Sequence, residues 1–377
     1  MKLEKFISGG FIEQYQYKSF IPEKIDHVWT WDDPQINVLL ENANKVLGEL
    51  NAFSLIVPDI DLFIHMHVLK EAQASSKIEG TKTEIDEVLL DKEVISPEKR
   101  DDWVEVQNYI SAMNHGVERL NEIPLSNRLL KEMHEILLSG ARGENKLPGE
   151  FRESQNWIGG NSLSDAVFIP PPKEDVPRLM GDLEKFLHHK DLNVPHLIKA
   201  AISHYQFETI HPFLDGNGRI GRLLITFYFV SNEILEKPCL YISDYFEKNK
   251  AMYYDLLTLT RKKNDLKSWI TFFLNGIIQT ASKGRDAFKK ILELRNNVEI
   301  KIQKLNRKSI KGKILIDYLY KKPIIGLNDV QKIFNSTKPT ANSLIKDFIR
   351  LNILFEFTGN KRNRRYVFKD YFNLFLK

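Results

Sequence analysis

The sequence is poor in cysteine and has no long apolar segment. Cys239 is the only cysteine among 377 residues, which excludes an intrachain disulfide framework and a four-cysteine zinc site. The N-terminal stretch MKLEKFISGGFIEQ lacks the apolar core of a signal peptide. The longest apolar runs, such as LLITFYFV, fall far short of the ~20 residues that a membrane span needs. We therefore predict a cytoplasmic protein that enters no membrane.

Several catalytic signatures are also missing. The chain contains no H-E-x-x-H metal motif, no Walker A motif and no nucleophile elbow. No internal repeat is evident either. The sequence thus gives no support for a zinc protease, a P-loop nucleotidase or an α/β-hydrolase.

Charge divides the chain into two unlike parts. Residues 301–377 carry 18 Lys and Arg against 5 Asp and Glu, a net charge of +13, which leaves −9 for residues 1–300. We predict an N-terminal arm and first helix (1–58), a helical domain (59–281), a charged connecting helix (282–308) and a separate basic domain (309–377).

Apolar residues recur at helical spacing through most of residues 59–281, so the fold class is mainly α. The pattern breaks at residues 141–172, which are rich in Gly, Asn, Ser and Pro. Short β-prone pieces occur there around Trp157 and Val167–Ile169. This composition predicts a loop with a small hairpin.

The basic C-terminal region has the pattern of a winged helix-turn-helix domain, in which three helices precede a two-stranded ribbon. KPTANSLIKDFIRL would be the recognition helix and GNKRNRR the wing tip. Such a domain binds DNA through phosphate contacts. It also serves for dimerisation or partner docking, and both roles stay open, as does a homodimer.

The densest chemistry lies in HPFLDGNGRIGR, residues 211–222, between two predicted helices. A helix N-terminus with glycines lets a phosphate approach unpaired backbone N–H groups. Arg219 and Arg222, one helical turn apart, complete an anion hole for a polyphosphate. Asp215 could hold Mg²⁺ and His211 could act as a general base.

Two other interpretations of this segment are weaker. Gly216, Gly218 and Gly221 match the G-x-G-x-x-G dinucleotide fingerprint, but the preceding HLIKAAISHYQFETI has helical rather than strand character. A plain glycine-rich turn with solvated arginines would explain the glycines or the arginines taken alone. It does not explain why both occur together in this order.

The segment resembles the Fic family motif H-x-F-x-[D/E]-G-N-G-R-x-x-R, and every specified position is filled. The resemblance implies a Fic-type helical bundle with a β-hairpin flap that transfers AMP from Mg-ATP to a hydroxyl side chain of a target protein. It makes His211 the base and Asp215 the Mg²⁺ ligand, with Phe213 as a buried anchor. The implied ATP-binding residues are Gly216, Asn217, Gly218, Arg219, Ile220, Gly221 and Arg222 in the motif, Asp165, Ala166, Val167 and Phe168 in the flap, and Tyr245 and Tyr254 downstream.

A second string resembles the inhibitory motif of the same family, [S/T]-x-x-x-E-[G/N]. Here Ser75, Glu79 and Gly80 fill it, at the end of a predicted helix (about 60–80) that precedes the catalytic core. The resemblance implies that Glu79 pairs with Arg222 and keeps ATP from its productive position. Some relatives use this glutamate to remove AMP instead.

Two classes of function follow. The first is an autoinhibited protein adenylyltransferase that takes ATP and a target docked on the flap, and itself as a further target. The second is a nucleotide-sensing DNA-binding regulator. Transfer of another phosphate-containing group, or removal of AMP, are lesser alternatives.

Overall fold

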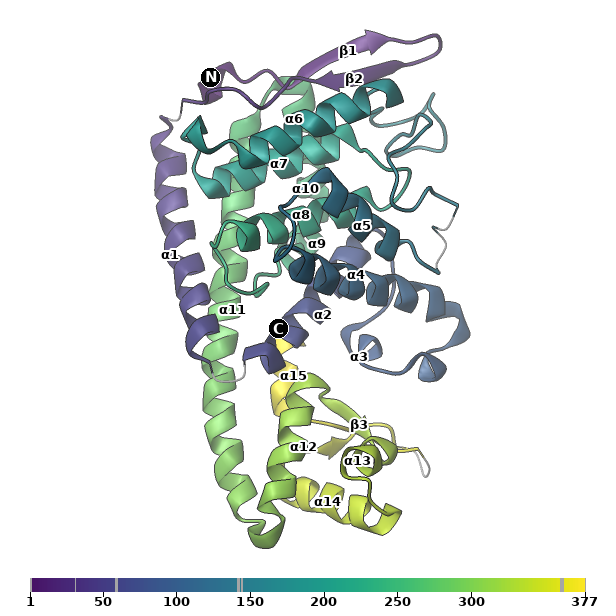
Figure 1. The fold of residues 1–377 in the computed structure, drawn as a ribbon, viewed down its shortest axis with the longest axis vertical. Helices are drawn as coiled ribbons and strands as arrows, with labels where there is room; N and C mark the ends of the chain where they lie inside the picture. The colour runs from purple at the N-terminus through teal and green to yellow at the C-terminus, as the bar shows by residue number, and fades with distance from the viewer. Residues whose placement is uncertain are drawn as a thin grey trace.

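The protein is built almost entirely from helices, as Figure 1 shows for the computed structural model. The structure describes residues 2–30, 32–57, 60–140, 143, 145–359 and 363–376. The domain predicted at residues 59–281 contains α2 (Ile60–Ile78), α3 (Ile85–Val88), α4 (Arg100–Arg119), α5 (Asn127–Leu137), α6 (Val176–His188), α7 (His196–Ile210), α8 (Asn217–Ser231), α9 (Ser243–Lys248) and α10 (Lys250–Lys263). Short 3-10 turns lie at Leu3–Lys5, Lys92–Val94, Pro97–Lys99, Lys173–Asp175, Lys190–Leu192 and Asn306–Lys308.

Helices α7 and α8 form the centre of this bundle. From Leu197 to Ile210 every residue of α7 is buried, polar ones included, and α8 is buried from Arg219 to Phe229. A helix that is buried on all sides has no solvent-facing stripe, and it requires partners for each polar group that it carries. The loop between these helices, residues 211–216, is therefore anchored at both ends in the buried core, although Asp215 within it is exposed.

A single long helix, α11 (Leu266–Gln303), runs through most of the molecule. Helix α1 (Pro34–Ile56) packs along it, and the N-cap Asp33 accepts hydrogen bonds from Gln35 N and Ile36 N. The sequence predicted a separate connecting helix at 282–308. That prediction was wrong in its bounds, because the segment is the distal part of a helix that already begins in the core.

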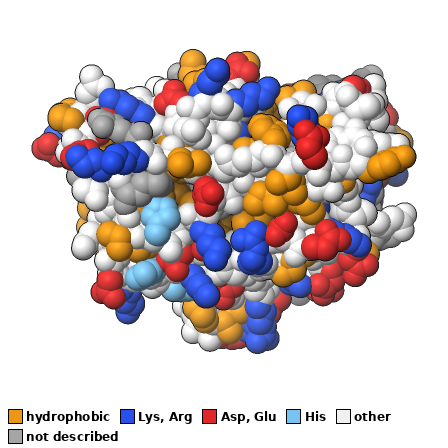
Figure 2. Space-filling view, turned by 90° about the horizontal axis from the view of Figure 1, so that it is seen from above, with side chains coloured by type: hydrophobic (Ala, Val, Ile, Leu, Met, Phe, Trp, Pro, Cys, Tyr) orange, Lys and Arg blue, Asp and Glu red, His pale blue; other side chains and the backbone are white. Residues whose placement is uncertain are grey.

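The N-terminal arm forms a hairpin that the sequence did not predict. Strands β1 (Gly9–Glu13) and β2 (Lys18–Pro22) pair antiparallel, with Phe11 opposite Phe20. The backbone N–H of Phe20 also donates to the carbonyl of Ile169, 2.9 Å away, so the hairpin adjoins the predicted flap. Figure 2 views this end of the molecule, where hydrophobic groups lie among charges of both signs. Ile7, Phe11, Ile12 and Tyr15 are exposed.

The C-terminal region contains α12 (Ser309–Lys321), β3 (Ile324–Gly326), α13 (Leu327–Phe334), α14 (Lys338–Arg350), β4 (Phe355–Glu356), β5 (Arg365–Val367) and α15 (Lys369–Leu376). The strands form one antiparallel sheet in the order β3-β5-β4. This order of elements agrees with the predicted winged helix, whose assignment stays a prediction. Residues 360–362 of the predicted wing tip lie outside the described residues.

Helices α12 and α15 of this region pack against α2. The ring of Phe63 on α2 lies 4.9 Å from that of Tyr320 and 6.2 Å from that of Tyr371, centroid to centroid. The first half of α2 is thus enclosed by the C-terminal region. Among the described residues, no helix has the length and apolar character to cross a membrane.

Candidate active site

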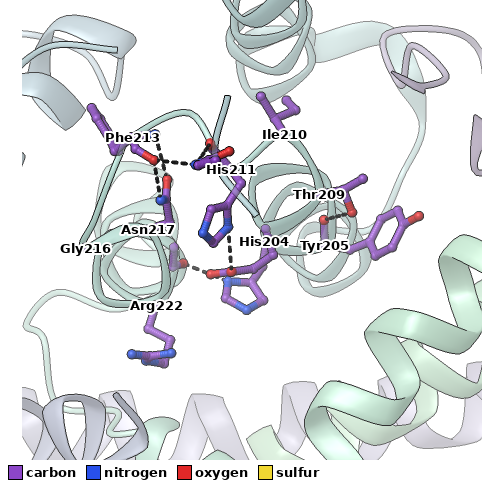
Figure 3. Close-up of polar contacts among 12 residues, drawn as sticks. His204, Tyr205, Thr209, Ile210, His211, Phe213, Gly216, Asn217 and Arg222 are labelled. Carbon is purple, nitrogen blue, oxygen red and sulfur yellow. Dashed lines mark hydrogen bonds and ion pairs between the residues drawn. The ribbon is translucent and has the colours of Figure 1, made fainter. Parts of the chain in front are cut away.

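The loop that carries the chemistry begins where α7 ends. His211 takes a left-handed conformation (φ 51°, ψ 61°) and its N–H donates to the carbonyl of Phe207. This conformation costs a non-glycine residue about 1–2 kcal/mol, and it turns the chain sharply into the loop. The Asn217 side chain then closes the loop, because it accepts from the N–H of Phe213 and donates to the carbonyl of the same residue, both at 2.8 Å. Figure 3 shows this arrangement, with His211 and Asn217 above Arg222.

The outer side of the loop rests on α5. The ring of His134 stacks on Phe213 with centroids 3.8 Å apart, so Phe213 is the buried anchor that the sequence predicted. His134 Nδ1 accepts from the N–H of Gly149, which leaves Nε2 to donate to the carbonyl of Asp215. Burial lowers the pKa of His134 to about 4, so the ring is neutral near pH 7 and serves as a structural bridge.

Two residues that sequence reasoning missed hold the backbone of His211. Arg152 Nε and Asn156 Nδ2 both donate to the carbonyl of His211, at 3.0 and 3.2 Å. Asn156 Nδ2 also donates to the carbonyl of Phe213 at 2.8 Å. The polar and charged sequence EFRESQN in the predicted loop indicates hydrogen-bonding side chains. It does not indicate which backbone carbonyls these side chains reach.

The residues of the predicted anion hole lie at the start of α8. Gly216 (φ 75°) precedes the helix, and Arg219 is buried beside it. Arg219 donates to Glu105 at 3.1 Å and lies 3.5 Å from Asp215. The Asp215 side chain is 46% exposed, so its carboxylate is open to solvent next to the helix N-terminus. The motif thus places the Arg219 guanidinium and the Asp215 carboxylate side by side at the N-terminus of α8, where the Gly216 N–H donates to Asp215 Oδ1.

The side chain of Arg222 is hydrogen-bonded to residues at the end of α2. It is among the largest fully buried side chains of the described chain. Its Nε donates to the hydroxyl of Ser75 at 2.8 Å, and Nη2 donates to the carbonyl of Ser75 at 2.9 Å and to Glu79 Oε1 at 2.7 Å. A buried guanidinium is tolerated only with such partners. Gly80 follows at φ 108°, a conformation that favours glycine and ends the helix there.

The Glu79 carboxylate also lies against the backbone of the predicted anion hole. A Cβ built on Gly218 would lie 2.2 Å from Glu79 Oε1, so this oxygen is in close contact with the backbone where the phosphate was predicted to bind. Glycine at 218 is what lets an oxygen approach so closely. Two of the three residues predicted as inhibitory, Ser75 and Glu79, therefore contact the predicted phosphate site directly, whereas Gly80 ends the helix behind them.

The remaining predicted ATP-binding residues are more scattered. Tyr254 is 38% exposed, and its pKa is raised, first by burial and then by the charge of Glu79. Tyr245 packs against Phe272, with ring centroids 4.9 Å apart. Tyr253 is a core residue whose hydroxyl pairs with His204 at 2.9 Å.

The predicted flap is a minimal hairpin with one antiparallel bridge, between Ile158 and Phe168. Asp165 accepts from the hydroxyl of Ser162 and from the N–H groups of Asn161 and Ser162, which lowers its pKa to about 2 and shapes the loop tip. Phe168 is buried, with the Arg261 guanidinium 4.0 Å from its ring centroid. Ala166 is half-buried, while Val167 is 60% exposed and can meet a partner.

Among the described residues, no group of three or more His, Cys, Asp or Glu side chains could hold a metal ion alone. Asp215 is therefore a lone candidate ligand, which suits Mg²⁺ because this ion is usually held by one or two carboxylates, substrate phosphates and water.

The sequence matches the Fic/DOC family N-terminal region over residues 38–118 and the Fic/DOC family over residues 124–229. The chain is a Fic domain protein. Its predicted fold class is confirmed by a Fic family protein from Desulfovibrio desulfuricans G20, which superimposes with a TM-score of 0.58 over 89% of this chain and 96% of that one, at 22% identity.

Two curated relatives are similar to the Fic region. Protein adenylyltransferase Fic from Aedes aegypti is 34% identical over 128 residues, which are 33% of this chain and 22% of that protein. A probable protein adenylyltransferase from Aquifex aeolicus is 31% identical over 179 residues, 47% of this chain and 52% of that protein. The chain therefore spans only 22% to 52% of these curated relatives.

Proposed function

We propose that the protein is an autoinhibited adenylyltransferase that transfers AMP from ATP to a hydroxyl side chain of a target protein. The observation that carries the proposal is the Glu79–Arg222 ion pair at 2.7 Å, which places the inhibitory carboxylate against the backbone of Gly218. An inhibitor seated in a phosphate site is consistent with an enzyme that binds a polyphosphate there when Glu79 moves away.

The chemistry needs one proton transfer and one displacement. His211 takes the proton of the target hydroxyl, the hydroxyl oxygen attacks the α-phosphorus, and pyrophosphate leaves. Arg219, Arg222 and the N–H groups at the start of α8 neutralise the phosphate oxygens. We assign Mg²⁺ to Asp215, where the ion would neutralise charge on the phosphates when bound.

We assign target docking to the flap, where the exposed Val167 is next to the single bridge and backbone pairing with an extended segment is available. The protein's own hydroxyl groups are a further target, and a homodimer stays a prediction. A cytoplasmic location suits the lone, buried thiol of Cys239.

The test is transfer of label from α-³²P-ATP with Mg²⁺ to the protein itself and to a cell lysate. The variants are wild type, Glu79→Gly, and Glu79→Gly with His211→Ala. We expect weak labelling by wild type, labelling about 30-fold stronger by Glu79→Gly, a gain within the usual range of allosteric coupling, and none by the double variant.

A Glu79→Gly protein that binds ATP and labels nothing would contradict AMP transfer. Label from γ-³²P-ATP would then point to phosphate transfer, and release of AMP from a pre-labelled target would point to AMP removal.

A second candidate function, DNA binding, is favoured by the outer face of α14. Lys338, Asn342 and Lys346 are exposed there, opposite the buried stripe of Ala341, Leu344, Ile345 and Phe348. We propose that this face contacts DNA. Exchange of both lysines for Ala should weaken retention of a duplex in a mobility-shift assay and reduce its salt dependence. Equal retention by the variant would contradict this role for α14.

A further inference from the structure

A buried carboxylate lies directly behind the proposed base. Glu208 is in the last turn of α7, three residues before His211, and is only 6% exposed. From this geometry we infer that Glu208 is a positioning residue, which orients the His211 ring through Nδ1 and neutralises the ring when it takes up the hydroxyl proton. The inference rests on the proposed function and adds a residue to it.

The carboxylate of Glu208 and the ring of His211 lie next to each other. Glu208 Oε2 lies 4.0 Å from His211 Nδ1. Among the described residues, neither His211 Nδ1 nor Glu208 Oε1 has a hydrogen-bond partner. Unpaired buried polar atoms are rare in folded proteins and call for an explanation. A small rotation of either side chain would join them.

Glycine in the motif makes room for this carboxylate. A Cβ built on Gly221 would lie 2.3 Å from Glu208 Oε1. Any side chain at 221 would therefore displace Glu208. The close approach of α7 and α8 at this point thus preserves the position of Glu208 behind His211.

His211 needs such a partner because its surroundings disfavour a positive charge. Burial, followed by the charges of Arg261 and Arg152, lowers the pKa of His211 to about 3. A general base works best when its pKa is near the operating pH. A carboxylate facing Nδ1 stabilises the imidazolium and so restores basicity at Nε2.

Several charged groups face Glu208 itself. Arg222 on α8 and Arg261 on α10 lower its pKa, the Glu79 carboxylate at the end of α2 raises it, and burial raises it most, to about 7. Below this pH the carboxyl is largely protonated and cannot neutralise His211. Activity should therefore rise with pH and then level off, and in a parent that lacks the Glu79 charge the rise should fall below pH 7.

The proton balance is simple. The hydroxyl O–H bond and the bond from the α-phosphorus to the pyrophosphate oxygen break as the new O–P bond forms. The proton passes to His211 Nε2, and pyrophosphate leaves. The Nδ1 proton stays on the ring, where it faces the Glu208 carboxylate. No electron transfer and no further reactant are involved.

The test uses full-length Glu79→Gly protein as the parent. Glu208→Gln keeps the size and loses the charge, whereas Glu208→Met also loses the acceptor. We expect Glu208→Gln to lower kcat/KM for AMP transfer by about 100-fold and to abolish the rise of activity with pH. The matched control is Glu71→Gln, because Glu71 is also buried with a pKa raised to about 7, yet its partners are Ser243 and Tyr109. The control should keep the rise.

A second readout does not depend on activity. Long-range ¹H–¹⁵N spectra at pH 8, assigned with His211→Ala, report which ring nitrogen carries the proton. We expect the Nδ1–H tautomer in the parent and a shift toward Nε2–H in Glu208→Met. An Nε2–H tautomer in the parent, or an unchanged tautomer and pH profile in the Glu208 variants, would overturn the inference. If the parent transfers no label, that result contradicts the proposed function and not the inference about Glu208. The tautomer of His211 would still show whether Glu208 orients the ring.

Discussion

The two ends of α2 are held by opposite kinds of contact. At the first end, Phe63 and His67 are enclosed by aromatic rings of the C-terminal region and of α11. At the other end, Ser75 and Glu79 make directional polar contacts with Arg222. Apolar packing is non-directional and its free energy grows with the area buried, whereas an ion pair is lost entirely when one partner finds a better one. One end therefore stabilises the fold, and the other is suited to be released.

The largest effect should come from the aromatic end. Phe63 is fully buried, so Phe63→Ala should lower the free energy of unfolding by about 3–4 kcal/mol through lost burial and a cavity. Urea denaturation measures this change. Phe11→Ala, at a ring that is 52% exposed, should cost much less.

The same variant tests the division between the two ends. At a temperature where it stays folded, Phe63→Ala should remain as weakly labelled as wild type. Labelling as strong as that of Glu79→Gly would contradict the comparison, and it would mean that the C-terminal region controls the inhibitory end through α2.

His67 gives the aromatic end a sensitivity to acid. Burial lowers its pKa to about 4 from an ordinary value of 6.5. As pH falls below 6.5 the unfolded chain binds a proton that the folded chain refuses until about pH 4, so stability is lost across this window and not above it. The loss attributable to His67 should be roughly 2–3 kcal/mol.

The check is to compare wild type with His67→Leu in urea denaturation at pH 7.5 and pH 5. The difference in stability between the two pH values should be smaller in the variant, because the contribution of His67 is removed. Some difference should remain, because the other buried histidines are retained. An equal difference in both proteins would show that His67 does not carry this sensitivity.

The polar end could be predicted from sequence far better than the aromatic end. Ser75, Glu79 and Arg222 stand in two short motifs whose chemistry is local. The structure pairs Glu79 with Arg222 as predicted, and it adds the contact of Ser75 with the same guanidinium. The loop after His211 was also predictable, because Asn217 closes it by bonds to Phe213, four residues away.

What sequence could not reveal depends on distant partners. The β1–β2 hairpin has no Asn-Gly or Gly-Gly turn, and its link to the flap is a backbone bond from Phe20 to Ile169. Arg152 reaches His211 from 59 residues away. The packing of Phe63 against Tyr320 and Tyr371 joins residues more than 250 positions apart in the sequence. Neither hydrophobic periodicity nor a sequence motif predicts such a contact.

The smallest effect should come from one hydroxyl at the polar end. Ser75→Ala removes the acceptor of the Arg222 Nε and leaves a buried charged donor unpaired there, while the bonds of Arg222 to the Ser75 carbonyl and to Glu79 remain. We expect a loss of about 1 kcal/mol in the free energy of unfolding and a slight rise in labelling.

The matched control for this variant is its neighbour Ser76, which is equally buried and whose hydroxyl has no partner among the described residues. Ser76→Ala should be neutral or slightly stabilising in the same urea titration, because it removes an unsatisfied polar group. Equal losses in the two variants would mean that the cost reflects packing on α2 in general. A loss confined to Ser75→Ala would show that the polar end is held by individual directional bonds, which is what allows a competing phosphate to release it.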